Sequence, residues 1–178
     1  MDLKNEDSDF FFKGYIDIEQ LRASGDAVLL LGCTVLTAWD RRVNIDSRSA
    51  VLFREFWNSA AAIPNMWVVP FNPADPVNTP NGVAPAAMPA MLAALKSAAF
   101  KLQGLGIAFD ARLGDYQTET RNGMCIPLHG GIGHIDGSYN SPTMRNALTA
   151  TGYNGVHSSR SYIQTVKFDD HGRWPRLC

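Results

Sequence analysis

Hydrophobic residues recur at helical spacing near the start of the chain. Between residues 16 and 39 the apolar positions repeat every three or four residues, with one interruption at Ser24-Gly25-Asp26. This pattern predicts two helices separated by a short break. The carboxylate of Asp26 can cap the second helix, because it can accept a hydrogen bond from a free N–H group of the first turn.

A third helix is expected to begin after Asp46 or Ser47 and to end before Pro64. Its apolar face is typical of a helix face packed in a protein core: Ala50, Leu52, Phe53, Phe56 and Trp57.

The prolines between residues 64 and 80 then exclude a regular helix and a central strand, since each removes a backbone donor and fixes φ. We expect an extended surface connection, pinned to the body by residues 67–69 and Phe71.

The next helix is expected to hold Pro85 and Pro89 in its first turns and to end at Gly104 as the C′ residue. After Gly106 the pattern changes to short β-branched and aromatic stretches between glycines, which is typical of strands. With helices over about residues 17–104 and strands in the second half, the expected fold class is α+β. The expected strands are Tyr116–Thr120, Met124–Leu128 and Ser161–Phe168, with a glycine loop from Gly152 to Gly155.

Composition narrows the possible partners. The chain has 178 residues, 46% of them hydrophobic, and 16 Lys+Arg against 17 Asp+Glu give a formal charge of -1. Because the chain has no excess of cationic side chains to neutralise phosphates, it is not expected to bind nucleic acid. The apolar runs are shorter than the ~20 residues that cross a bilayer, so we expect a soluble protein without a membrane span. An acidic start also argues against a signal peptide.

The three cysteines, Cys33, Cys125 and Cys178, allow at most one disulfide. Cys33 lies in a run of leucines and valines and is expected to be buried, whereas Cys178 at the chain end is expected to be exposed.

Cys125, His129 and His134 have a spacing compatible with a metal site, and Cys125 with His129 can also form a nucleophile and base pair. Neither signal is specific. We interpret them as a buried strand cysteine and two loop histidines.

Other candidate motifs are equally unspecific. Residues 129–133 (HGGIG) lack the Lys and Ser/Thr of a phosphate-binding P-loop, which favours a turn. Gly137-Ser138 has the composition of a self-cleavage junction, but Tyr139-Asn140 and the Pro142 turn that follow favour a plain loop. Four carboxylates beside glycines or at strand ends are interpreted as turn formers: Asp110, Asp115, Asp169 and Asp170. The residues alone therefore assemble no specific catalytic, metal or cofactor site.

Four blocks in the chain, taken in order, resemble a known family. They are LRASGDAVLLLGCTVLTAWDRRVNIDSRSAVLFREFW at 21–57, VVPFNPADPVNTPNGV at 68–83, LGDYQTETRNGMCIPLHGG at 113–131 and GYNGVHSSRSYIQTVKFDDHG at 152–172. They resemble the C-terminal part of the β chain of the penicillin acylase family, in its acyl-homoserine-lactone and aculeacin acylase branch. The resemblance covers about residues 15–172 and leaves 1–14 and 173–178 unmatched.

The resemblance implies part of an N-terminal-nucleophile hydrolase with an αββα fold. In that family a precursor cuts itself to expose a serine, whose hydroxyl attacks an amide carbonyl while its own α-amine serves as base. An asparagine side chain and a backbone N–H stabilise the oxyanion. The family works in the periplasm, without a cofactor, to remove acyl chains from amides.

The serine and the oxyanion asparagine have no counterpart in this chain, so the resemblance assigns it no catalytic residue, cofactor-binding residue or metal ligand. We expect a single partial domain over residues 1–178, a scaffold that is inactive without the α chain and the N-terminal part of the β chain. Two alternatives stay open: a stand-alone binding or oligomerisation module that self-associates, and an independent hydrolase built on Cys125, His129 and His134.

Overall fold

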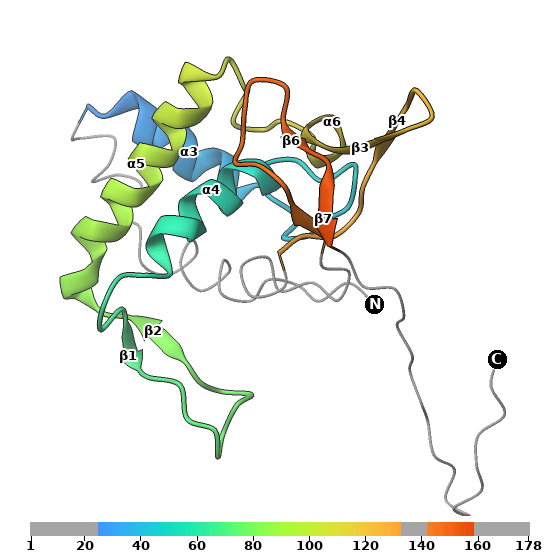
Figure 1. Cartoon of the computed structure of the whole chain (residues 1–178). Coiled ribbons are helices and arrows are strands. Elements are labelled where there is room, and N and C mark those ends of the chain that lie inside the picture. Colours follow the sequence, from blue (N-terminus) through green and yellow to red (C-terminus); the bar gives the residue numbers. More distant parts are fainter. Residues whose placement is uncertain (1–24, 133–141, 159–178) are drawn as a thin grey trace, which may run out of the picture.

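A layer of helices lies beside three small sheets in the computed structural model, which describes residues 25–132 and 142–158 (Figure 1). The main helices are α3 (Ala27–Thr37), α4 (Ala50–Ala60) and α5 (Met88–Gly104). The long helix α5 packs against both α3 and α4. Helices precede most of the strands along the chain, which confirms the predicted α+β class.

Asp26 caps α3 as predicted. Its Oδ1 accepts a hydrogen bond from the backbone N–H of Leu29 at 3.1 Å, and its Oδ2 lies 2.6 Å from Nζ of Lys96 on α5. The hydrogen bond from Lys96, followed by the one from Leu29, lowers the pKa of Asp26 below its ordinary value. One carboxylate thus caps α3 and ties it to α5. The helix predicted before Ser24 lies outside the described residues.

The predicted cap of α4 was wrong. The N-cap residue is Ser49, with φ of 72° and no side-chain cap bond, rather than Asp46 or Ser47. Asp46 pairs with Arg112 instead, and the N–H of Ser49 donates to the carbonyl of Ala111 at 3.2 Å. The segment before α4 is therefore held by a distant part of the chain, which a local capping rule does not detect.

The aromatic face of α4 forms the core, as predicted. Phe53 lies at its centre, with ring centroids 4.7 Å from Trp39 and 5.9 Å from Trp57. Tilted and offset ring pairs at these distances add to the free energy gained by burial. Cys33, Met91 and Leu95 extend the same cluster onto α3 and α5.

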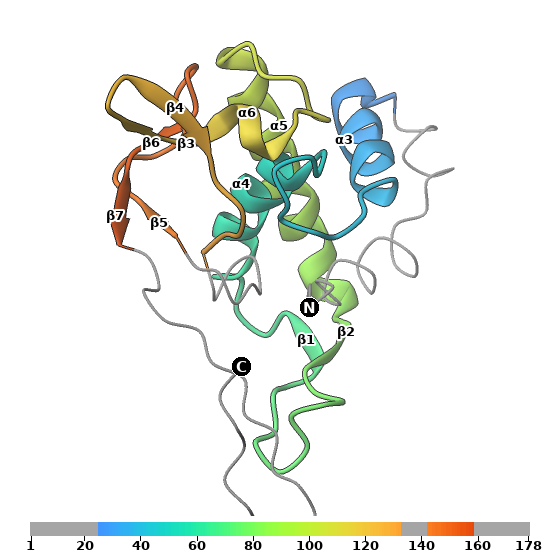
Figure 2. The same ribbon diagram turned by 90° about the vertical axis from the view of Figure 1, so that its right-hand side faces the viewer.

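Strands β1 (Trp67–Val69) and β2 (Asn81–Val83) pair antiparallel and form the base of a long hairpin. The proline-rich connection is therefore more regular than predicted, although it stays at the molecular edge and points away from the helices (Figures 1 and 2). The prediction that residues 67–69 and Phe71 pin it to the body was largely wrong. Trp67 packs near Trp57, but Val68, Val69 and Phe71 are exposed.

The helix α5 begins as predicted and ends slightly later. Pro85 opens a 3-10 turn, η1 (Pro85–Ala87), and Pro89 follows in the first turn of α5. Gly104 stays in the helix, so its assignment as the C′ residue was wrong. Gly106 takes that position with φ of 70°, and the N–H of Ile107 donates to the carbonyl of Leu102 at 2.9 Å, which closes a Schellman-type end.

The central sheet has the strand order β4-β3-β6. Strands β3 (Gln117–Arg121) and β4 (Met124–Pro127) form an antiparallel hairpin close to the predicted positions. The short helix α6 (Leu113–Tyr116) leads into β3. The predicted loop at 152–155 instead holds β6 (Tyr153–Asn154), which pairs with β3 in parallel.

A second small sheet pairs β5 (Thr143–Met144) with β7 (Val156–Ser158), and neither strand was predicted. The strand expected at 161–168 lies outside the described residues. No helix within the described part of the chain has the length and apolar character needed to cross a bilayer.

Candidate functional site

Cys125 and His129 do not form a recognisable reaction centre. Cys125 lies on β4, whose residues are all exposed, and His129, just beyond the strand end, is exposed as well. The prediction of a buried strand cysteine was therefore wrong in its burial, because β4 is the edge of the sheet and nothing described covers it. Among residues 25–132 and 142–158, no group of three or more metal-ligating side chains converges, and His134 lies outside these ranges.

Cys33 is buried in the helical core, as predicted. Burial raises its pKa to about 12, since the thiolate is unfavourable among apolar side chains. The thiolate is the reactive form of cysteine, so Cys33 is chemically inert in the folded protein.

Alkylation should separate the two thiols. Iodoacetamide at pH 8 is expected to modify Cys125 in the native chain and to leave Cys33 unmodified until denaturant is added, because Cys33 is both buried and held in the thiol form. Peptide mass spectrometry with and without urea measures the difference. Native labelling of Cys33 would contradict the packing of α3 against α5.

The glycine loop after β4 is held by backbone and amide contacts. The N–H of Gly130 donates to the carbonyl of Val43, and Nε2 of the buried Gln117 donates to the carbonyls of Leu128 and Gly130, each at 2.8 Å. The Gly130 amide is therefore already engaged and does not cradle a phosphate. The last residue of the HGGIG run lies outside the described residues.

Of the carboxylates that the sequence analysis interpreted as turn formers, the two within the described residues do not converge. Asp110 accepts from Nη1 of Arg48 at 3.1 Å on the surface, and Asp115 lies in the first turn of α6. Both carboxylates are exposed structural positions rather than parts of a converging site. Gly137-Ser138, Asp169 and Asp170 lie outside the described residues.

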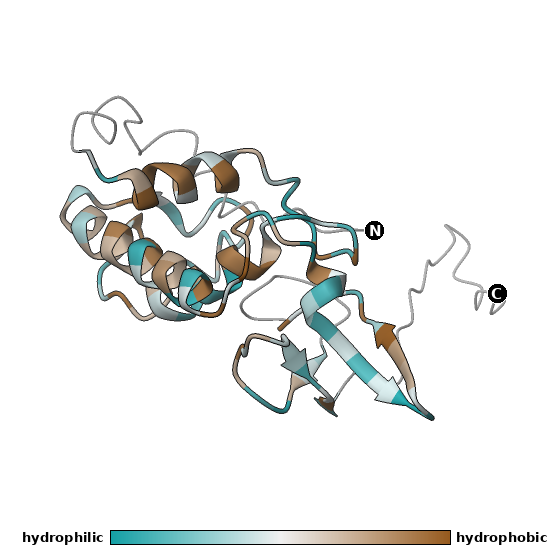
Figure 3. Cartoon of the chain, turned by 90° about the horizontal axis from the view of Figure 1, so that it is seen from above, coloured by the Kyte–Doolittle hydropathy of each residue, from teal (hydrophilic) through white to brown (hydrophobic). Residues whose placement is uncertain are grey.

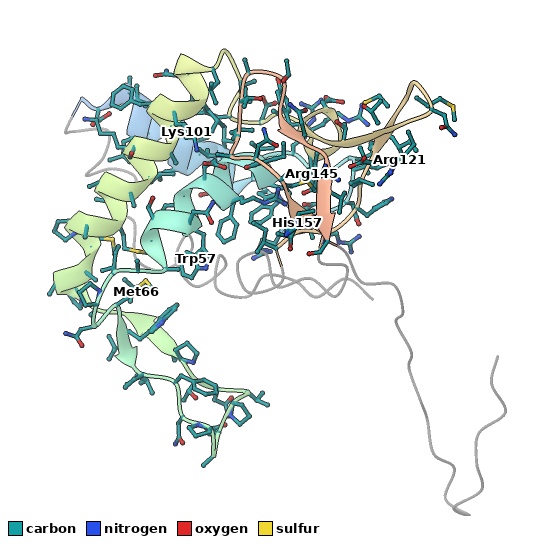
Figure 4. The ribbon with its side chains drawn as sticks, viewed as in Figure 1. Trp57, Met66, Lys101, Arg121, Arg145 and His157 are labelled. Carbon is teal, nitrogen blue, oxygen red and sulfur yellow. The ribbon has the colours of Figure 1, made fainter. Side chains whose placement is uncertain are left out.

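A buried polar centre joins α4, α5 and β6, and the sequence analysis missed it. It consists of Arg54, Glu55, Lys101 and Tyr153. Glu55 Oε2 lies 2.5 Å from Nζ of Lys101, and its Oε1 accepts from the Tyr153 hydroxyl at 2.5 Å. The Arg54 guanidinium lies 4.9 Å from the centroid of the Tyr153 ring. Among the four, only Lys101, which Figure 4 labels on α5, has a side chain that is substantially exposed.

This arrangement stabilises the fold rather than supplying a reactive group. Both oxygens of the Glu55 carboxylate are hydrogen-bonded and the side chain is buried, so the carboxylate is not open to a substrate in the way that a general base must be. The signal in the sequence was the adjacent Arg54-Glu55 pair inside an otherwise uncharged helix. Both residues are buried, and the partners described above come from α5, through Lys101, and from β6, through Tyr153.

An apolar groove of about 680 Å³ lies between α3 and the loop after α5. Its lining is mainly apolar: Leu31, Val35, Ala38, Ile107, Ala108 and Phe109. The exposed Arg48–Asp110 ion pair lies at its rim. The groove is open, with Leu31 half exposed, so part of α3 lacks a protein neighbour among the described residues.

The composition of α3 explains why the groove is apolar. Its sequence, AVLLLGCTVLT, contains no charged residue, and apolar segments follow its whole length (Figure 3). A helix that is hydrophobic all round is typical of one buried on several sides. Here one side packs on α5 and another faces the groove. The described fold is thus an α+β framework with open apolar surfaces, suited to packing against further polypeptide.

Comparison with known proteins agrees with this description. The chain belongs to the penicillin amidase family, whose model matches residues 3–176. It is 38% identical over 144 residues to "Acyl-homoserine lactone acylase PvdQ" of Pseudomonas syringae pv. tomato, covering 79% of this chain and 18% of that relative. It is 32% identical over 153 residues to "Aculeacin-A acylase" of Actinoplanes utahensis, covering 84% and 18% respectively.

The chain therefore spans about 18% of the length of these relatives. The resemblance to the acyl-homoserine-lactone and aculeacin acylase branch is confirmed by both relatives. What the comparisons establish for this chain is similarity to one portion of an acylase.

Proposed function

We propose that this chain is the C-terminal scaffold portion of an acylase, an amidohydrolase that removes acyl chains from amides such as acyl-homoserine lactones or lipopeptide- and penicillin-type substrates. The observation that carries the proposal is the 38% identity to an acyl-homoserine lactone acylase, over 18% of its length. The open groove beside α3 supports it, because an apolar surface of this kind is suited to burial against more protein.

In this proposal the reacting groups belong to polypeptide outside the chain. A serine hydroxyl attacks the amide carbonyl and its own α-amine takes the proton. The C–N bond then breaks as that proton passes to the departing amine, and water hydrolyses the serine ester to release the acyl group as a carboxylic acid. The residues described here supply rigidity to that centre. The buried polar centre contributes by joining two helices and a strand through one carboxylate. By the same resemblance, we propose the periplasm as the compartment.

A segment exchange tests the proposal. The residues of the P. syringae relative that match this chain are replaced by the corresponding residues of this chain, and release of homoserine lactone from an N-acyl substrate is measured by liquid chromatography. We expect the exchanged enzyme to retain acylase turnover, because the scaffold is interchangeable. The 178-residue chain alone is expected to show none. A folded but inactive exchanged enzyme would contradict the proposal.

The two alternative functions give different results in the same experiment. Turnover by the isolated chain that disappears in Cys125→Ala would favour an independent hydrolase built on the exposed thiol. A stand-alone binding module is favoured by the exposed apolar side chains. It would be supported by a concentration-dependent mass in sedimentation together with an exchanged enzyme that folds without activity.

A further inference from the structure

The hairpin that projects from the helical layer carries an unusual share of exposed apolar side chains. We call residues 67–83 the arm. Of the eight large hydrophobic residues exposed within the described part of the chain, four lie in this short segment: Val68, Val69, Phe71 and Val77. Val77 is 87% exposed and Phe71 is 61% exposed. Such a concentration of apolar surface marks a contact site more often than an ordinary loop.

Hydrogen bonds within the arm hold its loop in one shape. The Thr79 hydroxyl donates to the carbonyl of Asp75 at 2.6 Å and accepts from the N–H of Asn72 at 2.8 Å. The side chain of Asn72 in turn accepts from the N–H of Ala74 at 3.0 Å. The loop is therefore ordered before any partner arrives, which lowers the entropy cost of binding.

The base of the arm is fixed to the core. Met66 is buried, its carbonyl accepts from the N–H of Ala84 at 2.8 Å, and the rings of Trp57 and Trp67 are 6.4 Å apart. Figure 4 shows Trp57 and Met66 near the point where the arm leaves the helices. The exposed side chains are thus presented by a rigid support rather than by a loose tether.

The arm is almost uncharged, and this defines the chemistry of its partner. Its sequence contains one charged residue, Asp75, whose carboxylate accepts from the side chain of Asn78 at 2.8 Å. A surface with several apolar groups and a single, hydrogen-bonded carboxylate fits a largely apolar partner surface, since a charged partner would lose its hydration without compensation.

We propose that the arm docks on an apolar, uncharged face of the remaining acylase polypeptide. This inference rests on the proposed function. The occupant follows from length: the chain spans 18% of its relatives, so about four-fifths of such an acylase lies outside it. The ordered loop and the fixed base suit a permanent contact within one enzyme, in which Phe71 and Val77 are buried.

Thiol accessibility tests the docking directly. Val77→Cys is introduced into the isolated chain and into the exchanged enzyme, with Cys125 and Cys178 replaced by Ser, and maleimide labelling at position 77 is followed by peptide mass spectrometry. Labelling is expected to be at least about tenfold slower in the exchanged enzyme, because the side chain is buried there. Equal rates would overturn the docking, whether or not the enzyme is active.

A matched pair of phenylalanines supplies the control. Phe71 on the arm and Phe100 on α5 are both more than half exposed. In the isolated chain, Phe71→Glu and Phe100→Glu should each change Tm by less than about 2 °C, because exposed positions contribute little. In the exchanged enzyme, Phe71→Glu is expected to reduce the yield of active acylase about tenfold more than Phe100→Glu does.

The outcomes separate the two proposals. An active exchanged enzyme that labels freely at position 77 and tolerates Phe71→Glu would keep the proposed function and reject the docking of the arm. An inactive exchanged enzyme would reject the proposed function, while the labelling rate still reports on the arm. Concentration-dependent protection of position 77 in the isolated chain would identify a second copy as the partner and overturn the inference.

Discussion

Replacing Gly152 with alanine is expected to lower the free energy of unfolding by at least about 4 kcal/mol. Gly152 has φ of 99°, and a Cβ atom there would lie 2.4 Å from the backbone oxygen of Tyr116. Backbone atoms at this distance have no flexible end that can move aside, so the start of β6 must separate from α6. Urea denaturation followed by circular dichroism measures the loss.

Gly123 provides the matched control. It also has a positive φ, of 77°, in the turn between β3 and β4, but a Cβ atom there meets nothing within 4 Å. Gly123→Ala should therefore cost only about 1 kcal/mol, which is the price of the left-handed backbone alone. Equal losses for the two substitutions would contradict the close approach of Gly152 to Tyr116.

The substitution Glu55→Ala is also expected to have a large effect, lowering the free energy of unfolding by about 3 kcal/mol. It removes the acceptor of the buried Tyr153 hydroxyl and the ion-pair partner of Lys101. The same denaturation measurement applies, with a lower midpoint and an unchanged slope as the expected signature.

An exposed ion pair supplies the comparison for Glu55. Asp110→Ala removes the carboxylate that pairs with Arg48, where both side chains are more than half exposed, and should cost less than about 1 kcal/mol. A double-mutant cycle of Glu55→Ala with Tyr153→Phe then isolates the hydrogen bond between them. A coupling energy near zero would show that the bond does not stabilise the fold.

The elements that the sequence predicted well are those decided by neighbouring residues. Asp26 caps α3 locally, Pro85 and Pro89 occur where a helix start tolerates them, and β3 and β4 lie close to the strands expected at 116–120 and 124–128. The strands that were missed, β1, β2, β5, β6 and β7, have two or three residues each and exist through partners elsewhere in the chain. So short a pattern carries no periodicity of its own.

The functional features were predictable to different degrees. Family membership was evident from four ordered sequence blocks, whereas the buried polar centre was not, because helical periodicity assigns charged residues such as Arg54 and Glu55 to the solvent side. The burial of Cys125 was misjudged because a strand sequence does not reveal whether it lies at a sheet edge. The arm was read as anchored, since Phe71 and Val68 look like core residues until their surroundings are known.

The bond between Glu55 and Tyr153 has a consequence for biosynthesis. The two residues are separated by 98 positions. At about 5–20 residues per second, the ribosome needs about 5–20 s to add the tyrosine after the glutamate. During that interval the nascent helices can pair locally, but their carboxylate lacks its hydroxyl donor. The core is thus completed late in folding, by a contact between distant residues. Until then the helices expose apolar surface, and this is the stage at which chaperones have most to protect.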